Sequence, residues 1–152
     1  YFGSKDELFI QVLRKRDEVD AARFLPDDST DVAELPDVWV RLIRHNAEVP
    51  GLVALFSRMA AAADDASSPA HDYFAARGAQ LRAQMTDALT RLQADGSVTD
   101  RVPAELLARM LQALTDGLQL QWLVDPDFDM GSLIEALFEL ARPADDHVRG
   151  RG

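Results

Sequence analysis

Helical spacing of apolar residues is the feature that most constrains what this chain can fold into. Apolar residues recur three and four positions apart, and no run rich in valine, isoleucine and threonine alternates at strand length. Prolines, glycines and polar turns separate the apolar segments, as they do at helix ends. The pattern therefore predicts an all-α chain of about six helices.

Helix caps and breakers place the ends of these helices. A Ser-x-x-Glu capping box at Ser4 starts the first helix, and Pro26 ends it. Gly96 ends the long fourth helix, and Asp129 caps the sixth. The predicted helices cover about residues 4–25, 36–49, 52–63, 69–94, 103–124 and 130–141.

The charge balance argues against direct DNA binding by this chain alone. Its 16 basic and 26 acidic residues give a net charge of −10. An acidic surface repels phosphate, and nucleic-acid binding needs clustered lysine and arginine. Because the chain starts at Tyr1 rather than at a methionine, we expect it to be a fragment. The absence of cysteine excludes disulfides and is compatible with the cytoplasm, where we expect the protein to work.

Motifs of catalytic, metal and cofactor sites are missing from the sequence. His45, His71 and His147 are dispersed and do not have the spacing of metal ligands. Asp125–Asp129 resembles the opening of a calcium loop, but Ala136 stands where the loop needs a glutamate. We therefore expect no enzymatic activity, no metal and no cofactor.

The predicted fifth helix carries apolar residues on two faces. One stripe consists of Leu107, Leu111, Leu114, Leu118 and Trp122. The second stripe consists of Leu106, Met110, Ala113, Gly117, Leu120 and Val124. A helix on the surface of a monomer needs only one stripe. Neighbouring helices could enclose the second stripe, but a second copy of the chain explains it better.

The predicted sixth helix also has two apolar rows. One row consists of Leu133, Leu137 and Leu140, and the other of Ile134, Phe138 and Ala141. A two-fold dimer in which each subunit gives two helices to a four-helix bundle would bury both helices. The predicted dimer interface consists of Leu106, Met110, Ala113, Gly117, Leu120, Gln121, Val124, Ile134, Phe138 and Ala141.

Two segments resemble the TetR family of transcriptional regulators. Tyr1–Phe9, with its aromatic pair, Gly-Ser-Lys turn and anchoring Leu8, resembles the junction between the recognition helix and the next helix of that family. Asp116–Pro126 is similar to the penultimate helix of many members. The resemblance implies that residues 1–3 end a DNA-binding head and residues 4–143 form a ligand-binding and dimerisation domain, followed by a flexible tail at 144–152.

The same resemblance implies a function. Family members are homodimers that bind operator DNA through paired N-terminal helix-turn-helix heads, and a small molecule in the helical body changes the spacing of the heads. It implies a ligand-responsive regulator, most simply a repressor. Tyr1 and Lys5 occupy positions that can contact DNA phosphates, with a packing aromatic and a solvated charge as the alternatives.

The resemblance also implies a ligand pocket among the middle helices. The candidate ligand-binding residues are Trp39, Ile43, Asn46, Phe56, Met59, Phe74, Arg77, Leu81, Met85, Leu118 and Trp122. Plain core is the better explanation for each of the apolar ones, since any core needs apolar stripes at helical spacing. A mostly apolar pocket with a few polar anchors suits a hydrophobic or amphipathic ligand. Arg77 hints at an acidic group on that ligand, but a surface salt bridge is the favoured explanation for this residue.

Two other classes of function remain open from the sequence. One is a helical carrier or enzyme that binds a hydrophobic small molecule. The other is a helical dimerisation module without a ligand. The first lacks any recognisable set of catalytic residues, and the second differs from a regulator only in having no effector.

Overall fold

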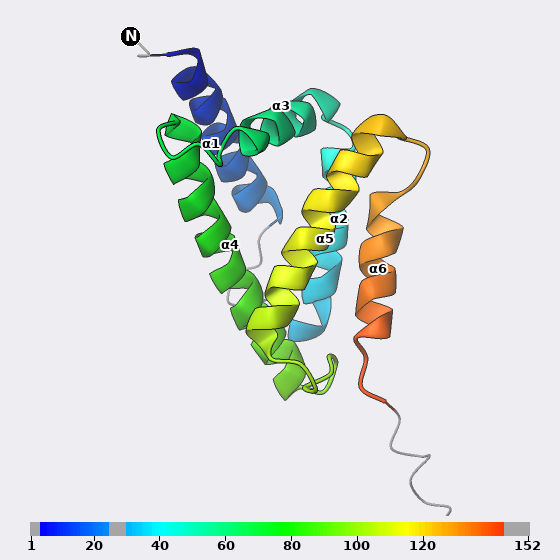
Figure 1. Cartoon of the computed structure of the whole chain (residues 1–152). Coiled ribbons are helices and arrows are strands. Elements are labelled where there is room, and N and C mark those ends of the chain that lie inside the picture. The colour runs from blue at the N-terminus through cyan, green and yellow to red at the C-terminus, as the bar shows by residue number, and fades with distance from the viewer. Residues whose placement is uncertain (1–3, 25–29, 145–152) are drawn as a thin grey trace, which may run out of the picture.

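The computed structural model describes residues 4–24 and 30–144, and within these ranges helices are the only regular secondary structure. It contains six α-helices and one short 3-10 turn, in the order shown in Figure 1. The elements are α1 (Lys5–Phe24), η1 (Val32–Glu34), α2 (Leu35–Asn46), α3 (Pro50–Ala61), α4 (Pro69–Ala94), α5 (Ala104–Val124) and α6 (Met130–Leu140). The prediction of an all-α chain with about six helices is confirmed.

The helices are arranged around two long pairings. α4 packs along α5, and α2 packs along α6. α1 lies against the first half of α4, and α3 crosses the same end of the molecule between α4 and α5 (Figure 1). Among the described residues, no helix is long and apolar enough to cross a membrane.

Side-chain caps start several helices where the sequence predicted them. The Ser4 hydroxyl accepts a hydrogen bond from the Glu7 amide at 3.1 Å, and Asp129 accepts one from the Gly131 amide at 3.0 Å. Gly96 has a φ of 83°, the left-handed conformation that ends α4 without steric cost. The third helix begins at Pro50, two residues earlier than predicted, because a proline is tolerated in the first turn of a helix.

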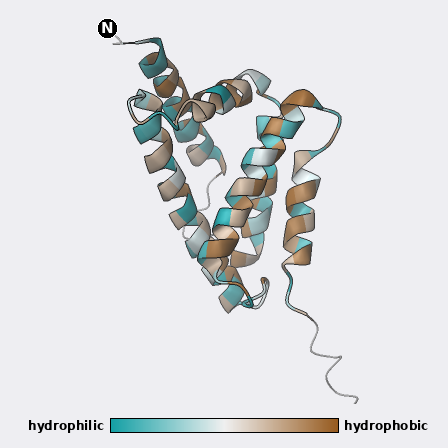
Figure 2. Ribbon diagram, viewed as in Figure 1, coloured by the Kyte–Doolittle hydropathy of each residue, from teal (hydrophilic) through white to brown (hydrophobic). Residues whose placement is uncertain are grey.

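The apolar residues form two separate cores. The larger core lies between α2, α5, α6 and the second half of α4, and includes Leu92, Leu111 and Ile134. The smaller core joins α1, α3 and the start of α4, around Leu13 and Phe56. In Figure 2, α6 is hydrophobic along most of its length, whereas hydrophilic and hydrophobic residues alternate along α1 and α4. α1 is thus held mainly by the smaller core.

Candidate ligand groove and pairing face

A cluster of polar side chains joins α1 to α4. Arg77 donates two hydrogen bonds to the Asp17 carboxylate, from Nε at 2.9 Å and from Nη2 at 3.3 Å. The Tyr73 hydroxyl donates a third hydrogen bond to Asp17, at 2.9 Å. One carboxylate from α1 is therefore held by two side chains of α4, in the two-pronged geometry that guanidinium groups favour.

The electrostatics of this cluster favour the ionised carboxylate. Burial by itself raises the pKa of Asp17, but the hydrogen bond and charge of Arg77, the Tyr73 hydroxyl and the charge of Arg16 together hold that pKa below its usual value. Burial and the neighbouring Asp17 charge raise the pKa of Tyr73 to about 12. Tyr73 thus remains a hydrogen-bond donor at neutral pH.

Two guanidinium groups lie over one aromatic ring in this cluster. The Arg77 guanidinium is 4.7 Å from the centre of the Phe56 ring, and that of Arg16 is 5.2 Å away. The Arg16 side chain is only 9% exposed, and its Nη2 lies 3.3 Å from Asp17. Its Nε is buried without a hydrogen-bond partner within the described part of the chain, and the nearest carboxylate oxygen, of Asp20, is 4.0 Å away.

A groove of about 840 Å³ opens beside this cluster. α1, α2 and α4 line the groove, with Arg16, Asp17, Tyr73 and Arg77 among its residues. Its apolar residues include Ile10, Leu42 and Leu81. The groove therefore combines an apolar wall with charged hydrogen-bonding groups, which is the usual composition of a small-molecule site.

Asp116 on α5 interacts electrostatically with Arg77 of the same cluster. Burial of its carboxyl group raises its pKa and the positive charge of Arg77 opposes that change, although the residue as a whole is exposed. A hydrogen bond of 3.5 Å from Asn46 to the buried Gln119 links α2 to α5 nearby. Polar residues of α1, α2 and α4 thus line the groove, and the Asn46 amide connects it to Gln119 of α5.

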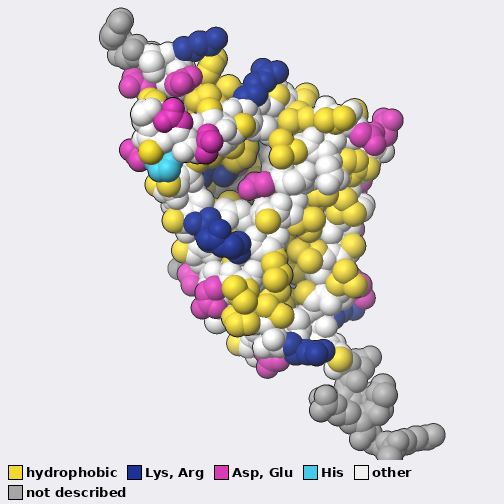
Figure 3. All heavy atoms as spheres, in the orientation of Figure 1, with side chains coloured by type: hydrophobic (Ala, Val, Ile, Leu, Met, Phe, Trp, Pro, Cys, Tyr) yellow, Lys and Arg dark blue, Asp and Glu magenta, His cyan; other side chains and the backbone are white. Residues whose placement is uncertain are grey.

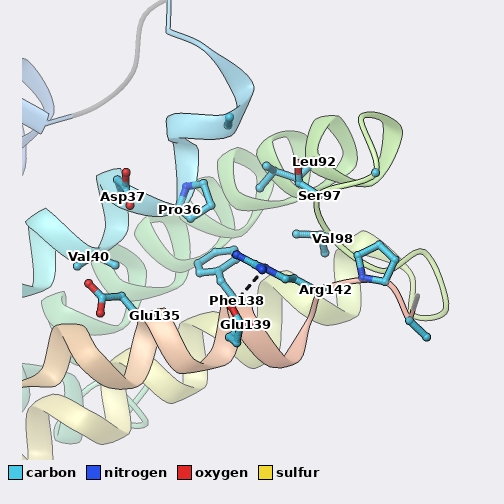
Figure 4. Close-up of a pocket in the computed structure, with 14 residues that line it drawn as sticks. Pro36, Asp37, Val40, Leu92, Ser97, Val98, Glu135, Phe138, Glu139 and Arg142 are labelled. Atoms are coloured by element: carbon cyan, nitrogen blue, oxygen red, sulfur yellow. Dashed lines mark ion pairs between the residues drawn. The ribbon is translucent and has the colours of Figure 1, made fainter. Parts of the chain in front are cut away.

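A second groove, of about 710 Å³, is lined by other residues of the body (Figure 4). Its walls come from α2, from the turn after α4 and from α6. The apolar side chains of Leu92, Val98 and Phe138 lie between these elements, as Figure 4 shows. Glu139 on its edge forms an ion pair of 3.2 Å with Arg142. The sequence did not point to this groove, because its residues come from segments with no shared pattern.

An uncovered apolar row runs along α5. Leu106, Met110 and Leu120 are each more than half exposed, and Val124 is 88% exposed. Hydrophobic side chains form a band over α5 and α6 in Figure 3. We use the name pairing face for the outward apolar residues Leu106, Met110, Leu120 and Val124 of α5 with Leu133 and Leu140 of α6.

Comparison with known families agrees with this architecture. A family model described as BetI-type transcriptional repressor, C-terminal, matches residues 52–142, which is more than half of the chain. The chain belongs to the TetR family. No curated protein and no solved structure matches it significantly. The resemblance of Tyr1–Phe9 and Asp116–Pro126 to the TetR family predicted this membership. The family match, which covers the middle and end of the chain, confirms that prediction.

Three of the eleven predicted ligand-binding residues line the groove beside α1: Asn46, Arg77 and Leu81. The structure places the other eight in the two cores. Trp39, Ile43, Met85, Leu118 and Trp122 belong to the larger core, and Phe56, Met59 and Phe74 to the smaller one. Trp39, for example, stacks on Phe138 with ring centres 5.7 Å apart.

On α5, the predicted interface residues form one outward strip. Ala113 and Gln121 are exposed like their larger neighbours, and Gly117 is half-buried. A Cβ atom built on Gly117 would meet nothing within 4 Å, so the surface there is open. The other described residues thus leave this strip uncovered.

On α6, the structure buries one member of the predicted interface row inside the subunit. Ile134 is only 1% exposed and belongs to the larger core, against which Phe138 and Ala141 also pack. The outward residues are Leu133 and Leu140, which are 41% and 84% exposed. Two equally apolar rows cannot be told apart by spacing, and packing against α2 decides which one turns inward.

The predicted phosphate-binding residues lie at the start of the chain. Tyr1 lies outside the described residues. Lys5 is exposed in the first turn of α1, with its Nζ 5.4 Å from the centre of the Phe9 ring. Phosphate contact by these two residues stays a prediction.

Sequence reasoning missed the partners of Arg77. Asp17 and Arg16 stand in a run of charged residues on α1, where each reads as a solvated surface charge. Tyr73 is buried to 6% exposure, yet its spacing matches that of any core aromatic. The only signal was indirect, because Arg77 lies one turn after Tyr73 and Phe74 and needs a partner if it faces them.

Proposed function

We propose that this chain is the ligand-sensing and pairing part of a DNA-binding transcriptional repressor. Membership of the TetR family supports a role in transcriptional regulation. The proposed response to a ligand rests on the groove between α1 and the body, because this groove combines an apolar wall with charged side chains that can bind a ligand. In this proposal the protein is cytoplasmic, uses no cofactor and has no enzymatic activity.

The groove is well placed to control a DNA-binding head. α1 directly follows the segment that resembles the end of such a head, and it also forms one wall of the groove. A molecule that enters between α1 and α4 must change how these helices pack. Two heads have to match DNA half-sites about one helical turn apart, so a small movement of α1 is enough to lose register.

The pairing face supports a homodimer. Its residues on α5 and α6 leave large apolar side chains in water, which a soluble protein normally covers. A two-fold axis would bring the same strip of each copy together and complete a four-helix bundle. The pairing proposal keeps the predicted α5 residues and replaces Ile134 with Leu133 and Leu140 on α6.

The function is tested with the whole encoded protein and DNA fragments from its own genome. We expect selection by repeated binding to recover a sequence with two-fold symmetry, to which the protein binds as a dimer. Small molecules that raise the melting temperature of the protein should also release this DNA in an anisotropy assay. Failure to select any specific sequence would exclude the regulator and favour a carrier or a dimerisation module.

A further inference from the structure

We propose that the groove beside α1 binds an amphipathic carboxylic acid, whose carboxylate displaces Asp17 from Arg16, Tyr73 and Arg77. This inference rests on the proposed function, because it names the chemical class of the ligand at the same groove. It follows from the donors that meet at one point of the groove, from an unused donor among them and from the apolar wall beside them.

The donors around Asp17 form a receptor for a carboxylate. Arg77 contributes two hydrogen bonds at 2.9 and 3.3 Å, Tyr73 one at 2.9 Å, and Arg16 one at 3.3 Å. All three donors keep their places through packing of their own, since both guanidinium groups lie over Phe56 and Tyr73 is buried. Such a prearranged set binds any carboxylate of suitable reach.

The receptor has one donor more than Asp17 uses. Arg16 is about nine-tenths buried and lines the groove, but its Nε has no hydrogen-bond partner among the described residues. The oxygen of Asp20 lies 4.0 Å from this Nε, beyond hydrogen-bond length. Leaving a buried cationic donor unpaired is costly, and an acceptor that enters from the groove would satisfy it.

The rest of the groove accommodates the apolar part of such a ligand. Ile10, Leu42 and Leu81 line it next to the donors. Its volume of about 840 Å³ lies within the range of small-molecule sites. An acid with an apolar chain would place its carboxylate on the arginines and its chain on these residues.

The rival ligand is an amphipathic amine, because carboxylates also face the groove. Glu7, Glu18 and Asp72 are exposed, so water and salt screen their charges. Asp20 lies 4.0 Å from the Nε of Arg16 and 3.5 Å from His45. An amine would have to use Asp17, which already holds Arg16, Tyr73 and Arg77, and would leave the Nε of Arg16 still unpaired.

Displacement of Asp17 would loosen one end of α1. Within the described part of the chain, α1 forms its side-chain hydrogen bonds and ion pair with α4 through the carboxylate of Asp17. Without that contact, α1 keeps its apolar anchors Ile10 and Leu13 in the smaller core. The carboxylate of the ligand would therefore compete with Asp17 for the hydrogen bonds of Tyr73 and Arg77.

Three ligands with the same eight-carbon chain separate the possibilities. Octanoate, octanol and octylamine are titrated into the full chain by calorimetry, and into the variants Arg77→Gln and Asp17→Asn. Arg91→Gln is the control for Arg77, because Arg91 is an exposed residue of the same helix. Asp6→Asn is the control for Asp17, because Asp6 is an exposed carboxylate of α1 that does not line the groove.

We expect octanoate to bind at least about tenfold more tightly than octanol, since a charge-assisted pair is lost in the alcohol. Arg77→Gln should remove most of that difference and leave octanol binding unchanged, which shows that the groove is intact. Asp17→Asn should tighten octanoate binding, because the competitor loses its charge. The two control variants should behave like the wild type.

Tighter binding of octylamine than of octanoate would refute the proposal that the ligand is a carboxylic acid. The proposed ligand-responsive function would remain valid. Equal binding of octanoate and octanol, octanoate binding that survives Arg77→Gln, or no binding of any of the three would also refute the carboxylic acid proposal. The DNA-release experiment above tests the regulator function separately, since it does not depend on the class of ligand.

Discussion

Replacement of Leu120 tests the pairing face most directly, because its effect can be worked out from the structure. Leu120 is 55% exposed, and a dimer would cover that half of the side chain. Full burial of a leucine contributes about 1.5–3 kcal/mol, so Leu120→Ala should cost about 1 kcal/mol in each subunit. Two-fold symmetry doubles the loss to about 2 kcal/mol, which raises the Kd of the dimer about 30-fold.

The assay is sedimentation equilibrium of the wild type and of Leu120→Ala over a range of protein concentrations. Leu120→Asp should weaken the dimer further, because it also places a charge in an apolar contact. Val19→Ala is a matched control, since Val19 is 52% exposed on α1, outside the pairing face. We expect the control to leave the Kd unchanged.

Two results would refute the reasoning about the pairing face. One is a wild-type chain that sediments as a monomer at micromolar concentration. The other is a dimer whose Kd is the same with leucine or aspartate at position 120, provided that both chains give the same helical circular dichroism signal. The second result would place the interface on another surface.

Three further predictions concern stability, measured by urea unfolding. Asp17→Asn should lower the free energy of unfolding by about 1–3 kcal/mol, because Arg77 loses its ion pair. The pKa of Asp17 is lowered in the folded chain, so this contribution is present above the usual pKa of about 3.9 and should disappear as the pH falls below it. Asp129→Ala should cost about 1 kcal/mol through loss of the α6 cap. Hydrogen bonds from Arg44, Ser132 and the Gly131 amide lower the pKa of Asp129 to about 2, so its contribution should be complete above the usual pKa of about 3.9 and should be lost as the pH falls from there to about 2. Gly96→Ala should cost about 1 kcal/mol because of its φ of 83°, whereas Gly51→Ala, in open space, should not destabilise the chain.

Most of the fold could be predicted from local pattern. Helix ends depend on short-range chemistry, such as the Ser4 cap, the Asp129 cap and the left-handed Gly96, and all three act as predicted. The start of α3 at Pro50 was missed because a proline permits both a break and a first turn.

The candidate site was only partly predictable. Arg77 could be selected because a charged residue near a row of aromatics needs an explanation. Its partner Asp17 comes from another helix, 60 positions away along the chain. Nothing in the neighbourhood of Asp17 distinguishes it from the other charged residues of α1, so only the packing of α1 against α4 brings the pair together.

The sequence by itself determined where the helices lie, that α5 has two apolar faces, and which family the chain belongs to. These features follow from residue spacing and from short motifs, which need no knowledge of neighbours. The tertiary structure decided that Leu133 and Leu140, rather than Ile134, turn outward on α6. It also decided that Asp17 occupies the arginines of the groove, because contacts between distant helices depend on packing that spacing does not encode.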